Sequence, residues 1–172
     1  MPESHDTHKQ LAAIASLEDL FARRRTAYWI FGGWAVDLHV GRVTREHADI
    51  DIAVWASDRV TVTTMLRDGG WDHRPEAGED GYTCFERATV RLEVAFLARD
   101  EHGEIYTPLA DGHGDWPEGS FGDDVGSVGE VRARVVSRAS LVVDKSAPRT
   151  DAATADKDRR DIASLQPPIV GR

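Results

Sequence analysis

Alternating polar and apolar positions are clearest between residues 49 and 54, in the run D-I-D-I-A-V. Successive side chains of an extended chain point to opposite faces, so Asp49 and Asp51 share one face and Ile50, Ile52 and Val54 share the other. The pattern predicts a strand that presents two carboxylates about 7 Å apart. Unpaired, these carboxylates would repel each other, and a divalent cation between them removes that repulsion. Mg²⁺ is usually held by one or two carboxylates together with substrate phosphates.

A second alternating run covers residues 90–97, and it is separated by two residues from the strand-like run at 82–87. This arrangement predicts a hairpin or near-hairpin. Val90, Leu92 and Val94 face one way, whereas Arg91 and Glu93 face the other. A lone glutamate in an otherwise apolar strand needs a partner. Two possibilities stay open: a salt bridge with Arg91, or a role as the third acid of a site with the two aspartates.

Helical spacing marks the N-terminal part of the chain, where Leu11, Ile14, Leu17 and Phe21 recur on one face. We expect one amphipathic helix ending near Thr26, preceded by a frayed segment at 1–9. Elsewhere the pattern predicts short strands at 28–31, 71–76 and 131–136. Further helices are predicted at 34–39 and 59–67, from Ser137 or Ser140 through Lys145, and at 154–165. Residues 100–129 are rich in Gly, Asp and Glu and show no clear period, so irregular strands or loops are expected there.

A glycine pair, Gly32 and Gly33, joins the predicted strand at 28–31 to the predicted helix at 34–39. A strand followed by such a pair and a helix exposes backbone N–H groups at the helix N-terminus, which suits an anionic phosphate. A plain tight turn is the alternative. The aspartate pair downstream favours the phosphate interpretation.

The connection between that helix and the aspartates carries Arg42, Thr44, Arg45 and His47. These residues could belong to a solvated loop. They are also placed to meet a triphosphate or a pyrophosphate leaving group, which arginine can bind with two parallel hydrogen bonds. We expect Arg45 rather than Arg42 to make this contact. His47 is expected to orient other groups rather than bind Mg²⁺, because Mg²⁺ prefers oxygen ligands.

Composition narrows the classes of protein. A chain of 172 residues forms one domain, or one domain with a small appendage. The net charge of −9 argues against a nucleic-acid backbone as the main partner, because phosphate binding needs a basic face. The single cysteine, Cys84, excludes an internal disulfide and a cysteine-based zinc site. No apolar run approaches roughly 18 residues and no secretory signal pattern is present at the N-terminus, so a cytoplasmic protein without a membrane partner is expected.

The stretch FGGWAVDLHVGRVTREHADIDIAVW, from Phe31 to Trp55, resembles the nucleotidyltransferases built on the DNA polymerase β palm. Their signature is a small-residue pair after a strand, then D-x-D or D-x-E on the next strand, and a third acid on a later strand. More narrowly, G-G-W-A-V-D-x-x-x-G-R-V-T-R-x-H-x-D-I-D-I is similar to the aminoglycoside 2''-adenylyltransferase and lincosamide nucleotidyltransferase branch. The close resemblance extends to Leu97 and is loose beyond it.

This resemblance implies an α+β fold: a polymerase β-like nucleotidyltransferase palm with a mixed sheet of about five strands and helices packed on it. It implies a nucleotidyltransferase domain at residues 1–137 and a short helical extension at 138–172 packed on the same domain. The segment K-D-R-R-D-I, starting at Lys157, is similar to the charged C-terminal helix of related enzymes. That segment could be a solvated helix face, or Lys157 could act in the site.

The resemblance also implies a chemistry. Three carboxylates, Asp49, Asp51 and Glu93, would hold one or two Mg²⁺ ions and carry catalysis. The expected product is a nucleoside monophosphate ester plus pyrophosphate, with ATP as the expected donor. Glu93 would accept the proton of the acceptor hydroxyl; the resistance enzymes typically have Asp here, so the role of the longer Glu93 stays open. The nucleotide would be bordered by the glycine pair and the following loop, namely Gly32, Gly33, Arg42, Thr44, Arg45 and His47.

Three functions are compatible with these features. The first is adenylyl transfer to a hydroxyl of a small molecule, an aminoglycoside or a lincosamide, with an acceptor pocket formed largely from residue 100 onward. The second is transfer to tRNA or protein, as toxin-like relatives do, although the acidic composition disfavours tRNA. The third is a non-catalytic nucleotide-binding protein, which the intact aspartate pair disfavours and the substitution at Glu93 keeps open.

Overall fold

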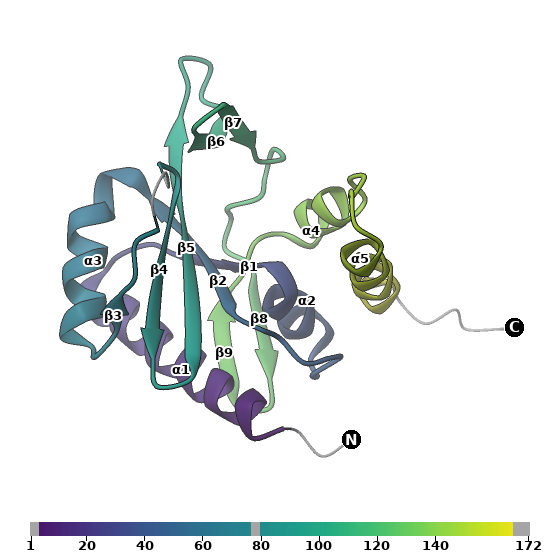
Figure 1. Cartoon of the computed structure of the whole chain (residues 1–172), viewed down its shortest axis with the longest axis horizontal. Helices are drawn as coiled ribbons and strands as arrows, with labels where there is room; N and C mark the ends of the chain where they lie inside the picture. The colour runs from purple at the N-terminus through teal and green to yellow at the C-terminus, as the bar shows by residue number, and fades with distance from the viewer. Residues whose placement is uncertain (1–3, 77–79, 167–172) are drawn as a thin grey trace, which may run out of the picture.

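The computed structural model describes residues 4–76 and 80–166. Its main element is one mixed sheet (Figure 1). The strand order along its main path is β1-β2-β5-β4-β3, and β6 and β7 continue from the far end of β5. β2 and β5 are parallel, and the other pairs are antiparallel. The strands of this sheet are β1 (Trp29–Phe31), β2 (Ile50–Trp55), β3 (Asp72–His73), β4 (Tyr82–Arg87), β5 (Val90–Arg99), β6 (Ile105–Leu109) and β7 (Gly112–Asp115).

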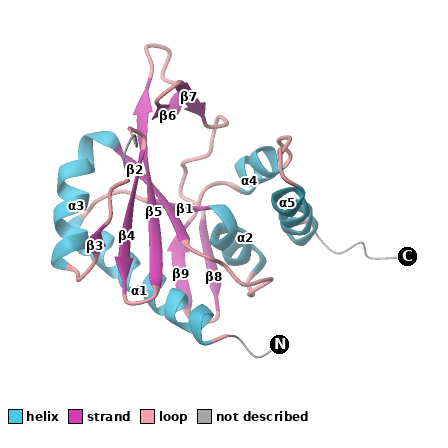
Figure 2. Cartoon of the chain, in the orientation of Figure 1, coloured by secondary structure: helices cyan, strands magenta, loops and turns pink. Residues whose placement is uncertain are grey.

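Helices surround this sheet, as Figure 2 shows by colour. The long helix α1 contacts β5, and α2 contacts β1 and β2 next to the C-terminal pair of α4 and α5. Side-chain oxygens start three of the helices by accepting a backbone N–H: Ser4 for α1, Ser137 for α4 and Asp151 for α5. The helices are α1 (His5–Arg24), α2 (Gly32–Val40), α3 (Arg59–Asp68), α4 (Arg138–Lys145) and α5 (Ala152–Leu165), with a 3-10 turn at Ala56–Asp58.

A separate hairpin, β8 (Val125–Val128) and β9 (Val131–Arg134), packs on α1 and α2. Its contact with α2 requires a glycine, because a Cβ at Gly126 would lie 2.6 Å from the backbone carbonyl of Leu38. A β-bridge between Ile30 and Val135 joins the hairpin to the edge of the main sheet. The hairpin therefore contacts α2 and is linked to the edge strand β1 at the same time.

The core lies between the sheet and these helices. The apolar faces predicted from alternation are buried: Ile50, Ile52 and Val54 of β2 are 0% exposed, as are Leu92 and Val94 of β5. Burial of one face at this scale is the dominant favourable contribution to the fold. The opposite face of β2 and β5 is consequently free to carry polar groups.

The α+β architecture with a mixed sheet is confirmed, but several predicted boundaries are wrong. The first helix begins at His5 rather than after residue 9, because Ser4 caps it and Gln10 is buried in a hydrogen-bonded position. The second helix starts at Gly32, not Trp34. The predicted strand at 71–76 is only Asp72–His73. Residues 100–129, where irregular strands or loops were expected, do contain short strands, namely the β6–β7 hairpin and β8.

Two further expectations concern the domain boundaries and membrane association. The division into a domain at 1–137 and an extension at 138–172 stays a prediction, and residues 167–172 lie outside the described ranges; α4 and α5 do contact α2. As for membranes, within residues 4–76 and 80–166 every helix is too short or too polar to cross a bilayer.

Candidate active site

The parallel pairing of β2 with β5 brings three carboxylates together. Asp51 is opposite Glu93 in the register of the two strands, and Asp49 lies immediately before β2. Neighbouring strands are about 4.8 Å apart, so residues opposite each other on one face can meet. One carboxylate oxygen from each of Asp49, Asp51 and Glu93 lies within 4.8 Å of the others. All three side chains are partly exposed, so a ligand can reach them.

The glycine pair lies directly against this cluster. Gly32 has φ of +66°, and a Cβ built on it would be 2.3 Å from Asp51 Oδ2. A Cβ on Gly33 would be 2.5 Å from both Arg45 Nη2 and His47 Nδ1. Gly32 and Gly33 are the first residues of α2, so the positive end of that helix dipole lies beside the carboxylates.

Charge accumulates in the cluster. Desolvation of Asp51, followed by repulsion from Asp49 and then Glu93, raises the pKa of Asp51 to about 8, and the positive charges of Lys145 and Lys157 only partly offset this. Oxygen donors that converge and repel one another match the ligand preference of Mg²⁺. The residues present therefore fit a divalent cation, with Asp49, Asp51 and Glu93 as its candidate ligands.

Both possibilities that the sequence left open for Glu93 occur together: it forms a salt bridge with Arg91, and it belongs to the acidic cluster. Arg91 Nε and Nη2 each lie 3.2 Å from Glu93 Oε1, so the salt bridge forms. The same guanidinium donates to Glu76 Oε1 at 3.2 Å. The hydrogen bonds that Arg91 donates to Glu76 and, to a lesser extent, to Glu93 raise the pKa of Arg91, although desolvation opposes this rise. Glu93 therefore has one oxygen paired with an arginine while its carboxylate still belongs to the acidic cluster.

The loop that was predicted to border the nucleotide is held largely by contacts within the protein. Thr44 donates to Asp37, and His47 Nε2 lies 2.6 Å from the other oxygen of Asp37. Arg45 bonds to Asp161, while Arg42 is exposed. Contact of these four residues with a nucleotide stays a prediction.

Sequence reasoning missed Asp37 and Asp161. Asp37 is 0% exposed and Asp161 1% exposed, and both accept hydrogen bonds from the loop. Asp37 carried a usable signal: it is an acid between apolar residues in the middle of a predicted helix, and a buried charge needs a partner. Nothing local marks the partner of Asp161, because Arg45 is 116 residues away in the chain.

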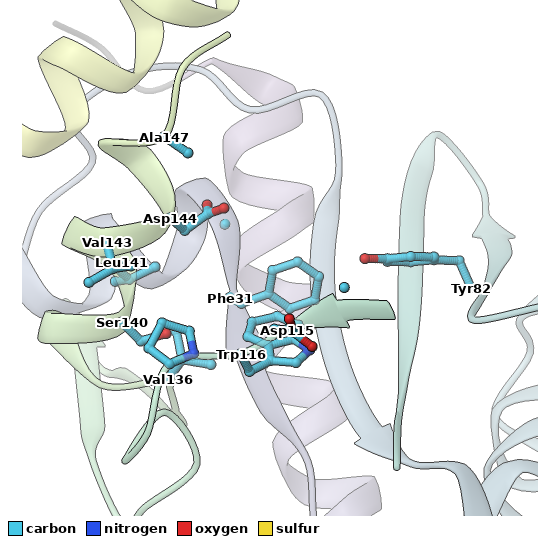
Figure 3. Close-up of a pocket in the computed structure, with 13 residues that line it drawn as sticks. Phe31, Tyr82, Asp115, Trp116, Val136, Ser140, Leu141, Val143, Asp144 and Ala147 are labelled. Carbon is cyan, nitrogen blue, oxygen red and sulfur yellow. The ribbon is translucent and has the colours of Figure 1, made fainter. Parts of the chain in front are cut away.

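A cavity of about 540 Å³ opens beside Gly32 (Figure 3). Phe31 and Trp116 pack edge to face at its floor, with ring centroids 5.2 Å apart, and the hydroxyl of Tyr82 points toward Phe31 from the other side. Helix α4 forms the remaining wall. Burial and the carboxylates of Asp144, Asp51 and Glu93 raise the pKa of Tyr82. The lining residues are Phe31, Gly32, Tyr82, Gly114, Asp115, Trp116, Pro117, Val136, Ser140, Leu141, Val143, Asp144 and Ala147.

Fold and site together define a nucleotidyltransferase palm. The structure of ANT(2'')-Ia in complex with adenylyl-2''-tobramycin aligns with a TM-score of 0.68 at 22% identity, covering 92% of this chain and 90% of that one. The sequence model of the aminoglycoside-2''-adenylyltransferase family matches residues 13–165, and the chain belongs to that family.

Two curated relatives share the motif region. A 2''-aminoglycoside nucleotidyltransferase from Klebsiella pneumoniae is 59% identical over 75 residues, which is 44% of this chain. A lincosamide resistance protein from Staphylococcus haemolyticus is 39% identical over 71 residues, which is 41% of this chain. The matched segments span only 34% and 42% of those relatives' own lengths.

Proposed function

We propose that this protein is a Mg²⁺-dependent nucleotidyltransferase that moves a nucleoside monophosphate, AMP from ATP, to a hydroxyl of a small molecule. The proposed acceptor is an aminoglycoside or a lincosamide. The main observation behind this proposal is that carboxylate oxygens of Asp49, Asp51 and Glu93 lie within 4.8 Å of one another, beside the glycine pair at the start of α2.

The roles follow from the chemistry of these groups. The acceptor oxygen attacks the α-phosphorus of ATP, the bond to the β-phosphate bridging oxygen breaks, and pyrophosphate leaves with that electron pair. Glu93 takes the proton of the hydroxyl. Mg²⁺ held by Asp49, Asp51 and Glu93 would neutralise charge on the phosphates. Gly32 and Gly33 are the first residues of α2, and the free backbone N–H groups at this helix N-terminus are the proposed phosphate contact. Arg42 is the exposed cation of the following loop.

The cavity beside Gly32 is proposed to receive the acceptor. Its carboxylates, Asp115 and Asp144, suit an ammonium group, while Phe31, Tyr82 and Trp116 offer apolar faces to a sugar or amino-acid ring. Lys and Arg are missing from the lining that the structure describes, which makes the cavity a poor site for a triphosphate. Because the cavity borders Gly32, an acceptor bound there would have a hydroxyl next to the carboxylate cluster.

The relatives support a small-molecule acceptor. The fold neighbour is described in complex with adenylyl-2''-tobramycin, and the curated relatives are named for 2''-aminoglycosides and lincosamide resistance. Among the two antibiotic classes, the stronger local identity is to the aminoglycoside relative.

A transfer assay tests the proposal. ATP labelled at the α-phosphate and Mg²⁺ are incubated with the protein and, separately, with aminoglycosides, lincosamides and bulk tRNA. We expect label on an antibiotic and release of pyrophosphate, both abolished by Asp51→Asn. Label on tRNA or on protein would contradict the small-molecule acceptor. Absence of transfer in every mixture, with Mg²⁺-dependent ATP binding intact, would favour the non-catalytic alternative.

A further inference from the structure

A chain of partly buried polar contacts begins on the C-terminal helix α5 at Asp161. This carboxylate accepts hydrogen bonds from Arg45 Nε and Nη2, both at 2.9 Å, and lies 2.7 Å from Lys145 Nζ. Burial opposes ionisation of Asp161, but the bonds from Arg45 and Lys145 outweigh it and lower its pKa below the usual range. Asp161 is thus a charged acceptor that meets a planar guanidinium at two points, a strong and directional contact.

Arg45, held by Asp161, also forms a hydrogen bond with His47. Its Nη1 lies 3.0 Å from His47 Nδ1, and arginine can only donate, so Nδ1 accepts and the ring hydrogen is on Nε2. That hydrogen points to Asp37, 2.6 Å away and fully buried on α2. Asp161 and Asp37 therefore hold Arg45 and His47 between them in one rotamer and one tautomer.

The hydrogen bonds that Arg45 donates to protein atoms indicate a structural role for this residue. A guanidinium has five N–H groups. Four hydrogen bonds are made by Arg45: two to Asp161, one to the backbone carbonyl of Glu46 and one to His47. A paired donation from Arg45 to a phosphate would require it to release Asp161. Its engagement therefore favours a structural role over the predicted nucleotide contact.

Arg45 and His47 lie directly against the glycine pair that borders the carboxylate cluster. Arg45 Nη2 and His47 Nδ1 occupy the space that a Cβ of Gly33 would need, and Gly33 is next to Gly32, which touches Asp51. Two residues after His47, the chain reaches Asp49. Gln10 of α1 donates to the backbone carbonyl of His47 at 2.9 Å, which gives the same backbone a further contact.

We propose that Asp161 is a positioning residue for the carboxylate cluster: by clamping Arg45, and His47 through it, Asp161 fixes the backbone that carries Asp49. The inference rests on the proposed function, because it takes the cluster as the Mg²⁺ site. It also connects the T-R-x-H motif of the loop with the K-D-R-R-D segment of the last helix. Partners that orient metal ligands are worth about 10- to 100-fold in affinity or activity.

The helix offers a matched control. Asp158, one turn earlier, is also buried and paired, with Lys145 at 3.2 Å and Arg149 at 2.6 Å, but its hydrogen bonds do not include Arg45. Asp158→Asn and Asp161→Asn each remove one buried negative charge, and both should lower the melting temperature. Affinity for Mn²⁺ alone, followed by electron paramagnetic resonance, separates them. We expect Asp161→Asn to bind Mn²⁺ about 10-fold more weakly or worse, and Asp158→Asn to bind it as the wild type does.

A second measurement uses the wild-type protein. Long-range ¹H–¹⁵N spectra of the histidine rings, with the His47 signals assigned from a His47→Gln spectrum, should show the Nε2–H tautomer. In Asp161→Asn, if it folds, the tautomers should mix. Equal Mn²⁺ affinity of the two Asn variants, or an Nδ1–H tautomer of His47 in the wild type, would overturn the inference. Neither readout needs an acceptor, so failure of antibiotic transfer is distinguishable from failure of the clamp.

Discussion

Asp51 brings a carboxylate oxygen to within 2.3 Å of the position that a Cβ would occupy at Gly32. Gly32 also has a left-handed backbone, with φ of +66°. The glycine is thus required twice, once for its conformation and once for the space it leaves to the acid. This relationship explains why the motif begins with a glycine at this end of α2.

Gly32→Ala should therefore disable the site. The left-handed backbone costs about 1–2 kcal/mol with a side chain, and the new methyl group must push Asp51 away. Because a misplacement of about 1 Å can cost about 100-fold in rate, we expect at least that loss of kcat in the transfer assay. Gly41→Ala is the control: Gly41 has φ of +86°, yet the nearest atom to its Cβ is 3.9 Å away. It should lose similar stability and keep its turnover; equal activity of both variants would refute the steric argument.

Glu93→Gln should retain the fold and much of the nucleotide binding but lose about 10²- to 10⁴-fold in kcat if Glu93 is the general base. Glu93→Asp should keep more activity, because a carboxylate remains. Arg91→Ala removes the partner of Glu93 Oε1 and should change kcat far less. Steady-state kinetics decides between these roles. If the salt bridge is the only purpose of Glu93, the Gln variant will turn over like the wild type, and Arg91→Ala will perturb the protein as much.

Nucleotide binding should depend on the divalent cation. The three carboxylates alone should hold Mg²⁺ weakly, and ATP should bind more tightly with it, because phosphate oxygens complete the octahedral coordination that Mg²⁺ demands. Isothermal titration calorimetry with ATP, in Mg²⁺ and in excess EDTA, measures the difference. Asp51→Asn should bind ATP equally under both conditions. The same affinity for the wild type with and without Mg²⁺ would contradict the metal site.

The raised pKa of Asp51 predicts how stability changes with pH. The folded, metal-free protein keeps a proton on Asp51 up to about pH 8, whereas an unfolded aspartate releases it near pH 3.9. Asp51 therefore contributes stability that is fully present below about pH 4 and is lost as pH rises through about 8. In EDTA, Asp51→Asn should gain in melting temperature relative to the wild type as pH is raised over this range.

Mg²⁺ provides the check on this pH effect. At about pH 8.5 the ionised cluster is most repulsive, so added Mg²⁺ should raise the melting temperature of the wild type and leave Asp51→Asn unchanged. Thermal unfolding followed by circular dichroism measures both. A gap between the two proteins that does not vary with pH would mean that Asp51 is not the titrating group.

Local sequence was sufficient for the parts of this protein that depend on periodicity and motif. Strict alternation assigned Asp49 and Asp51 to one face and Ile50 and Ile52 to the buried one, since side chains of an extended strand alternate. The G-G and D-I-D-I motifs together were specific enough to identify the family, and the hairpin at 82–97 followed from two strand-like runs with a two-residue break.

The family resemblance implied that Asp49, Asp51 and Glu93 share a site, but only the tertiary structure shows how these residues meet. The parallel register that sets Asp51 opposite Glu93 depends on the packing of two strands far apart in the chain. The clamp between Arg45 and Asp161 joins residues 116 positions apart, and the cavity combines β1, β4, the 114–117 segment and α4. Periodicity reports which face of an element is buried; it carries no information on which distant element covers that face, because that choice is made by the global packing of the core.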